Sequence, residues 1–281
     1  MAFRTPARIC DVDQGCTPIG TAGTSAVPPE VRDEARRIAE KEYGAGTNNA
    51  KVLAEQMTAL YLMAEDKDVA LIFNPGGWGW ALVPEMPPWA TILKGMKEVL
   101  EEAGQKVMTL NYLRTPRSLS GRLGEARTLL RLSHTKGREL AALTEFLTHH
   151  RPRLKVIIAG ESNGAAMSED TMRFLRDNSR AFSVQTGTPF WAPSKSHPRS
   201  LIINHNGVEP DAFSSGNVFR CLTANIQALF GRYKGSRGNI LFYIGAPGHV
   251  YNWEYDTVRR GITNFLHQTV IPSIISDHVK S

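Results

Sequence analysis

The feature that most constrains the fold is an alternation, from Asp68 onward, of short β-branched or apolar runs with longer segments of helical periodicity. We expect strands over six runs: 69–74, 106–111, 155–159, 181–185, 201–204 and 239–244. Three- and four-residue apolar spacing predicts helices over 91–103, 138–149, 165–176, 218–230 and 255–275. Such alternation is typical of βαβ units, so the sequence predicts an α/β fold: a mostly parallel sheet flanked by helices. The crossover at 187–199 is too short to form a large cap domain.

The first 65 residues lack this alternation of strand-like and helical segments. Residues 1–28 are rich in Gly, Thr and Pro without sustained periodicity, which predicts an irregular arm, whereas 30–43 and 49–64 have helical spacing. We therefore divide the chain into an N-terminal arm and helical extension, 1–65, and a main domain, 66–281. The extension has three open roles: covering a site, completing the sheet edge or forming a dimer contact.

Composition excludes several classes of protein. With 42% hydrophobic residues, 281 residues can bury a sizeable core. The net charge of +6 is spread along the chain, which disfavours nucleic-acid binding because a nucleic-acid footprint concentrates its charge on one face. Cys10, Cys16 and Cys221 are too scattered for a disulfide framework, and no apolar stretch approaches the roughly 18 residues of a membrane helix. We expect a soluble cytoplasmic protein.

The motif with the most chemical content follows the predicted strand 155–159. It reads Gly160-Glu-Ser162-Asn-Gly164 and runs into a helical pattern. A serine hydroxyl is a weak nucleophile, so an enzyme exposes it on a sharp turn, supplies a base and places N–H donors where an oxyanion forms. Glycine at both flanks of Ser162 allows that turn, which makes Ser162 a candidate nucleophile.

A glycine-rich turn follows the first predicted strand. It reads Asn74-Pro-Gly-Gly-Trp-Gly-Trp80 and can supply one N–H to an oxyanion hole, with the second from Asn163. A dinucleotide loop is the competing interpretation, but Leu82 stands where its last glycine would fall, and no phosphate-loop lysine follows.

The candidate base and acid follow the last two predicted strands. His249 comes after a Gly-Pro-Gly-type turn, which places it in a loop. Asp211 and Glu209 follow the strand 201–204, and either carboxylate could orient the imidazole. We prefer Asp211 and keep Glu209 as the alternative acid.

These motifs resemble the α/β-hydrolase superfamily of serine esterases and lipases, from about Asp68 to the C-terminus. The resemblance rests on the elbow, the glycine-rich turn and the chain order Ser162, Asp211, His249. It implies that Ser162 is the nucleophile, His249 the base and then acid, and Asp211 the orienting carboxylate. It also implies oxyanion donors at Gly77 and Asn163, with Gly76 and Trp78 as substitutes for Gly77. Two opening strands of that fold are not visible in residues 1–65.

The predicted function is hydrolysis of a small-molecule ester or related acyl compound through an acyl-enzyme, without a cofactor. Trp80, Trp191 and Tyr251 are expected to line a substrate pocket, although aromatic side chains equally support loops. The alternative is a non-catalytic α/β-hydrolase-like domain that binds a small ligand or a protein partner. A metal-dependent hydrolase built on His249, Glu254 and Asp256 has no recognised ligand spacing, so no metal site is expected. The sequence leaves open the natural substrate, its leaving group and the oligomeric state.

Overall fold

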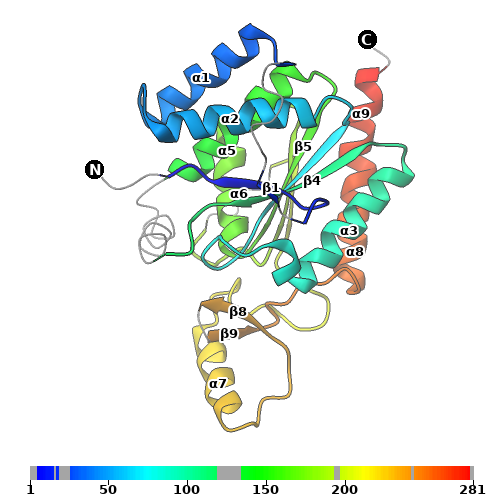
Figure 1. Ribbon diagram of the computed structural model, residues 1–281. Helices are drawn as coiled ribbons and strands as arrows, with labels where there is room; N and C mark the ends of the chain where they lie inside the picture. The colour runs from blue at the N-terminus through cyan, green and yellow to red at the C-terminus, as the bar shows by residue number, and fades with distance from the viewer. Residues whose placement is uncertain are drawn as a thin grey trace.

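The main sheet has seven strands in the order β2-β1-β4-β3-β5-β6-β7 (Figure 1). The computed structural model describes residues 5–15, 17–18, 26–118, 134–192, 197–241 and 244–278. The strands are β1 (Arg8–Asp11), β2 (Thr17–Pro18), β3 (Val69–Asn74), β4 (Val107–Leu113), β5 (Lys155–Glu161), β6 (Ala181–Thr186) and β7 (Ser200–Ile203). The five strands from β4 to β7 in this order are parallel, whereas β1 pairs antiparallel with β4 and β2. The predicted mostly parallel sheet is confirmed.

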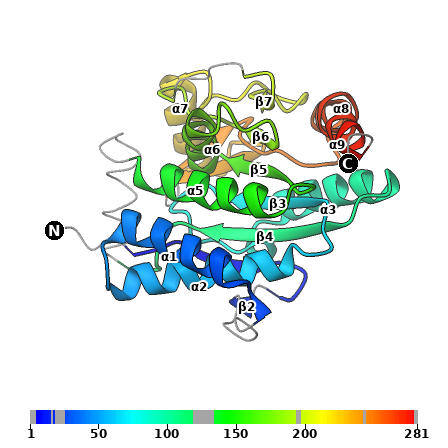
Figure 2. The same ribbon diagram turned by 90° about the horizontal axis from the view of Figure 1, so that it is seen from above.

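Helices cover both faces of this sheet (Figures 1 and 2). One face packs against α1 (Pro29–Tyr43), α2 (Asn48–Met63), α5 (Thr135–His150) and α6 (Asn163–Phe174), and the other packs against α3 (Pro87–Glu102), α8 (Asp256–Phe265) and α9 (Ile271–His278). Along β3, Ala70 and Ile72 face the first core, while Val69, Leu71 and Phe73 face the second. Because both faces of the strand are buried, its sequence is continuously apolar rather than alternating.

The N-terminal arm is partly regular, contrary to the prediction. Residues 8–11 form β1 and continue the sheet beside β4, with Ile9 opposite Tyr112 and Cys10 opposite Asn111. A four-residue strand is too short to show a reliable period, and its conformation is fixed by hydrogen bonds to a distant strand. The two predicted helices are present as α1 and α2, and they share one core with the sheet. The division at residue 65 stays a prediction.

The predicted strand 239–244 is wrong as a member of the parallel sheet. This region forms β8 (Arg237–Leu241) and β9 (Ile244–Pro247), which pair with each other in a separate antiparallel sheet. Together with α7 (Val218–Leu229) they make a small unit at the lower end of the molecule in Figure 1. An apolar run predicts a strand but not its partner, and here the partner is the next segment of the chain.

The C-terminal helical segment is interrupted once. Where one helix was predicted over 255–275, α8 passes through a π-helical turn at Leu266–Val270 into α9. Of the helices in the described ranges, none combines the length and the apolar character needed to cross a bilayer.

Candidate active site

Ser162 sits on the sharp turn between β5 and α6. Its backbone angles are φ 52° and ψ −119°, and it is the one residue other than glycine with positive φ in the described part of the chain. A Cβ on Gly160 would lie 2.5 Å from the Gly164 carbonyl oxygen, and a Cβ on Gly164 would lie 2.1 Å from the Asn74 carbonyl oxygen. Both glycines are therefore required by close backbone approach, as the sequence predicts. A strained residue between a strand and a helix, flanked by two such glycines, has the backbone geometry that a nucleophile elbow requires.

His249 and Asp211 form a buried pair beyond the elbow. Nδ1 of His249 lies 2.8 Å from Oδ2 of Asp211, and both side chains are almost completely inaccessible to solvent. The same oxygen accepts hydrogen bonds from the Ser214 hydroxyl at 2.8 Å and the Tyr251 hydroxyl at 2.6 Å. Oδ1 accepts the N–H groups of Phe213 and Ser214, so one carboxylate both closes a turn and orients an imidazole.

Ser162 and His249 both meet the end of β6. The Ser162 N–H donates to the Thr186 carbonyl at 2.9 Å, and the next residue, Gly187, is so close to the imidazole that a Cβ there would lie 2.6 Å from His249 Cε1. Ser162 Oγ and His249 Nε2 are both buried, and neither has a hydrogen-bond partner in the described ranges. A buried polar atom without a partner is costly, so these two atoms indicate a place where a substrate or a water binds.

The glycine-rich turn after β3 lies against the elbow. The Asn163 side-chain amide donates to the Gly77 carbonyl at 3.0 Å, and a Cβ on Gly76 would lie 3.4 Å from Ser162 Cβ. Gly77 has φ 55°, and Asn163 is the first residue of α6, where backbone N–H groups have no partner within the helix. The glycine-rich turn and the start of α6 therefore lie beside Ser162, whereas the oxyanion role of these residues stays a prediction.

Arg114 supports this turn, and no pattern in the sequence points to it. Its side chain is 1% exposed and donates to the Pro75 carbonyl at 2.7 Å, while its backbone N–H donates to the Gly79 carbonyl at 2.8 Å. Thr115 donates to the Trp78 carbonyl. The guanidinium holds the Pro75 carbonyl and the backbone N–H holds the Gly79 carbonyl, so this one residue fixes the turn at two points.

The structure separates the two candidate acids. The Glu209 carboxylate pairs with Arg220 at 2.6 Å and accepts from the Tyr233 hydroxyl at 3.3 Å, so its bonds lead away from the histidine. Asp211 is the carboxylate beside His249.

The predicted pocket residues have different surroundings. Tyr251 is fully buried with its hydroxyl on Asp211, so it supports the carboxylate and does not line an open pocket. Trp80 stacks on Trp78 with ring centroids 6.0 Å apart. Trp191 is 39% exposed and makes an edge contact with Phe213, whose ring contacts that of His249 at 5.1 Å.

The charges at the site are shaped by burial and by neighbours. Burial raises the pKa of Asp211, but the hydrogen bond and charge of His249, with the donors Tyr251 and Ser214, lower it below its ordinary value. Burial and the charge of Asp211 raise the pKa of Tyr251, which keeps its hydroxyl protonated as a donor. Loss of hydration raises the pKa of Glu161 to about 7; the charge of His249 opposes this shift, and that of Asp211 adds to it.

Asn206 connects the loops that carry the acid and the base. Its side chain is 1% exposed, and its amide donates to the carbonyls of Gly248 and Val250, the two neighbours of His249. Its side-chain oxygen accepts the N–H groups of Val208 and Glu209. The Asn206-Gly207 pair predicts a turn from the sequence, but nothing in the sequence predicts the contact of Asn206 with residues more than 40 positions later.

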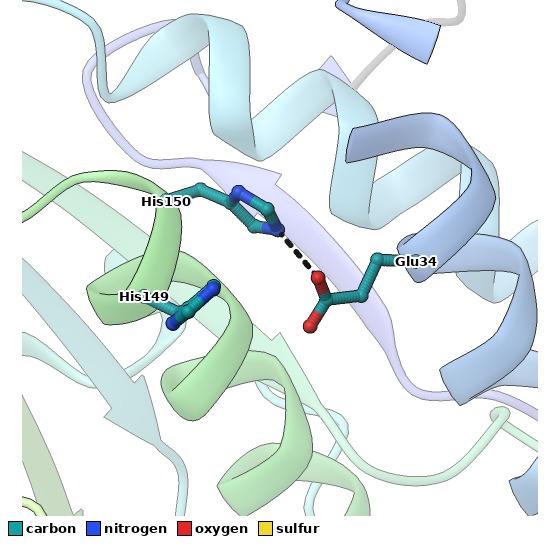
Figure 3. A group of neighbouring side chains, drawn as sticks. All are labelled: Glu34, His149 and His150. Atoms are coloured by element: carbon teal, nitrogen blue, oxygen red, sulfur yellow. Dashed lines mark hydrogen bonds and ion pairs between the residues drawn. The ribbon is translucent and has the colours of Figure 1, made fainter. Parts of the chain in front are cut away.

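Within the described ranges, one group of side chains has the chemistry of metal ligands, and it lies far from the serine. Glu34 on α1 faces His149 and His150 at the end of α5, with all three ligand atoms within 4.8 Å of one another (Figure 3). The Glu34 carboxylate lies 3.1 Å from His150 Nε2. α5 ends before β5 begins and Ser162 follows the end of β5, so the length of the strand, about 20 Å, separates them. Near His249, Asp256 is instead paired with Arg259 and Arg260.

Comparison with known proteins gives a distant structural likeness. No family model and no curated protein matches the chain. Among solved structures it is similar to the Trichoderma reesei cutinase in complex with a C11Y4 phosphonate inhibitor, with 14% sequence identity and a TM-score of 0.43. The match covers 88% of this chain and 95% of the cutinase chain. At this TM-score the likeness decides neither the family nor the activity of the chain.

Proposed function

We propose that this protein is a serine hydrolase that cleaves carboxylic esters, with Ser162 as nucleophile, His249 as base and Asp211 as the orienting acid. The observation that carries the proposal is the hydrogen bond from His249 Nδ1 to Asp211, which leaves Nε2 buried and unpartnered at the strand end that also contacts Ser162. An imidazole held at one nitrogen by a carboxylate presents the other nitrogen as a base.

The first half-reaction forms an acyl-enzyme. Ser162 Oγ attacks the ester carbonyl carbon while His249 Nε2 takes the hydroxyl proton, and Asp211 stabilises the resulting imidazolium. The oxyanion accepts hydrogen bonds from the backbone N–H groups of Gly77 and Asn163, with Gly76 and Trp78 as alternatives to Gly77. The tetrahedral intermediate collapses, His249 gives its proton to the departing alkoxide, and an alcohol leaves.

The second half-reaction restores the enzyme. A water molecule loses a proton to His249 Nε2 and attacks the acyl carbonyl, and the same oxyanion donors stabilise the second intermediate. The bond to Ser162 Oγ breaks, the serine recovers its proton from His249, and the carboxylic acid is released. Trp191 and Phe213 beside His249 and the Trp78–Trp80 pair beyond the oxyanion turn are the aromatic surfaces available to a substrate.

A fluorophosphonate probe tests the nucleophile directly. We expect the folded wild-type protein to be labelled covalently, and Ser162→Ala to abolish both labelling and hydrolysis of p-nitrophenyl esters. Ser168→Ala is the matched control, because Ser168 is a buried serine on α6, six residues after Ser162, whose hydroxyl bonds the Gly164 carbonyl. Absence of labelling in a folded wild type would favour the non-catalytic alternative, a domain that binds a small ligand or a partner.

A further inference from the structure

The chain between Asp211 and His249 leaves the main sheet and exposes large apolar side chains. Seven of the eleven large hydrophobic residues that are exposed in the described ranges belong to this one segment. They are Val218, Phe219, Leu222, Ile226, Leu229, Phe230 and Ile244. Single exposed apolar residues are ordinary, but a contiguous apolar surface marks an interaction site.

The exposed residues form a stripe along α7. Phe219, Leu222, Ile226 and Leu229 recur at three- and four-residue spacing, and Phe219 and Leu229 are 76% and 84% exposed. The other side of the helix is anchored: Ala224 is buried, and the Asn225 side chain bonds both the N–H and the carbonyl of Gly245 on β9. The helix is therefore fixed with its apolar stripe toward solvent.

The charge of the same segment is entirely positive. No aspartate or glutamate occurs between Asp211 and Glu254, while Arg220, Arg232, Lys234 and Arg237 do. Arg220 is occupied by Glu209, but the other three follow the C-terminal end of α7 and are exposed. An apolar helical stripe bordered by basic residues is the pattern of helices that lie in the surface of an anionic membrane.

We propose that α7 and the basic segment 230–237 dock this protein on an anionic lipid surface. The apolar surface is a single convex helix, and a fluid lipid surface accepts such a shape without a complementary groove. A second copy suits it less well, because a two-fold contact brings identical patches together and this segment has no acidic residue to meet the basic ones. Anionic headgroups supply the missing negative charge.

Docking at this surface has a consequence for the substrate, which rests on the proposed function. Asp211 immediately precedes this segment and His249 immediately follows it, so the surface is joined directly to the acid–base pair at both ends. The aromatic contact from Phe213 to His249 lies at the base of the same unit. An ester embedded in a lipid aggregate would then be the preferred substrate class over a freely dissolved ester.

Co-sedimentation with vesicles tests docking without any catalysis. The protein carrying Ser162→Ala is mixed with vesicles of phosphatidylglycerol and phosphatidylcholine, or of phosphatidylcholine alone. We expect binding to the anionic vesicles, weakened at high salt, and a loss on the order of a hundredfold in partitioning for Phe219→Ser with Leu229→Ser. The double variant Arg232→Gln with Lys234→Gln should bind less to the anionic vesicles, with no change in its interaction with vesicles of phosphatidylcholine. Phe174→Ser, an exposed phenylalanine on α6, is the matched control and leaves binding unchanged.

Two results would overturn the docking proposal. One is a folded protein, verified by circular dichroism, that sediments with neither vesicle type. The other is a dimer in light scattering that the Phe219 and Leu229 changes dissociate, without vesicle binding, since a second copy then covers α7. Fluorophosphonate labelling of the wild type is independent of both results, so failure of docking is distinguishable from failure of the proposed hydrolase.

Discussion

His249 Nδ1 lies 2.8 Å from Oδ2 of Asp211 although α7, β8 and β9 separate the two residues along the chain. The small unit that these elements form returns the chain to the point at which it left the sheet. Asn206 fixes this return by bonding the carbonyls on both sides of His249. The position of the imidazole therefore depends on the loop before Asp211 as much as on β9, the strand that precedes His249.

Substitution of each candidate acid by its amide should affect kcat/KM unequally. Asp211→Asn replaces the carboxylate that orients His249, and we expect kcat/KM for a p-nitrophenyl ester to fall by about three to four orders of magnitude. Glu209→Gln removes an ion pair with Arg220 and should change kcat/KM by less than about threefold. Equal losses in both variants, or a loss in Glu209→Gln alone, would contradict the assignment of Asp211.

Tyr251→Phe should act through Asp211. The hydroxyl of Tyr251 is a 2.6 Å donor that helps lower the pKa of this carboxyl, so its removal raises that pKa. A carboxyl whose pKa is lowered in the folded state stabilises the fold when the pH is above its ordinary pKa, and this stabilisation is lost as the pH falls toward the folded-state pKa. The acid-side loss of stability should therefore be smaller in the variant and should end at a higher pH, and kcat should fall roughly tenfold. Tyr112→Phe, which removes a buried hydroxyl bonded to the Lys136 carbonyl, should leave the pH profile of kcat unchanged.

Glu161 should make the fold less stable toward neutral pH. Its pKa is raised from 4.5 to about 7, so its stabilising contribution is present below the lower value and is lost as pH rises through the higher one. We expect the free energy of unfolding of Glu161→Gln to exceed that of the wild type progressively between these values, by up to about 3 kcal/mol. Denaturant titrations at several pH values measure this difference. The exposed Glu254→Gln is the control, and a constant offset in Glu161→Gln would contradict the prediction.

Two glycine substitutions should differ sharply in stability. Gly164→Ala places a methyl group 2.1 Å from the backbone oxygen of Asn74, and neither α6 nor the end of β3 can move far enough to relieve this contact. The free energy of unfolding should therefore fall by about 3 kcal/mol or more. Gly261→Ala on α8 meets only Ile203 Cδ1 at 3.4 Å and should stabilise the helix by up to about 1 kcal/mol. Thermal melts of both variants give the comparison, and a mild effect of Gly164→Ala would show that the elbow can relax.

Metal removal should leave hydrolysis unchanged. The Glu34, His149 and His150 group lies at the opposite end of β5 from Ser162, so an ion bound there is too far away to polarise a substrate carbonyl. Activity after dialysis against EDTA should equal that before it. A different result would place a metal in the reaction: EDTA lowers the activity of the wild type, Zn²⁺ restores it, and the double variant His149→Ala with His150→Ala shows no such EDTA-dependent loss.

The sequence alone predicts the parts of the fold whose signals are local. Strands β3, β5 and β6 lie within two residues of their predicted ends, because strands buried on both faces are continuous apolar runs. The elbow pattern Gly-x-Ser-x-Gly is also visible in the sequence, but its reasons are mixed: Gly160 is needed by the nearby Gly164 carbonyl, whereas Gly164 is needed by the distant Asn74 carbonyl. The chain order Ser162, Asp211, His249 follows from the predicted strand ends, although the strand before His249 belongs to a separate hairpin.

Only the tertiary structure decided which groups meet. Asp211 and Glu209 are two residues apart and chemically alike, and their separation into a partner of His249 and a partner of Arg220 depends on side-chain directions set by distant segments. The same holds for Tyr251, whose hydroxyl turns inward to Asp211, and for α7, whose apolar stripe turns outward. Periodicity specifies that a segment has an apolar face, whereas the packing of the rest of the chain determines what that face contacts.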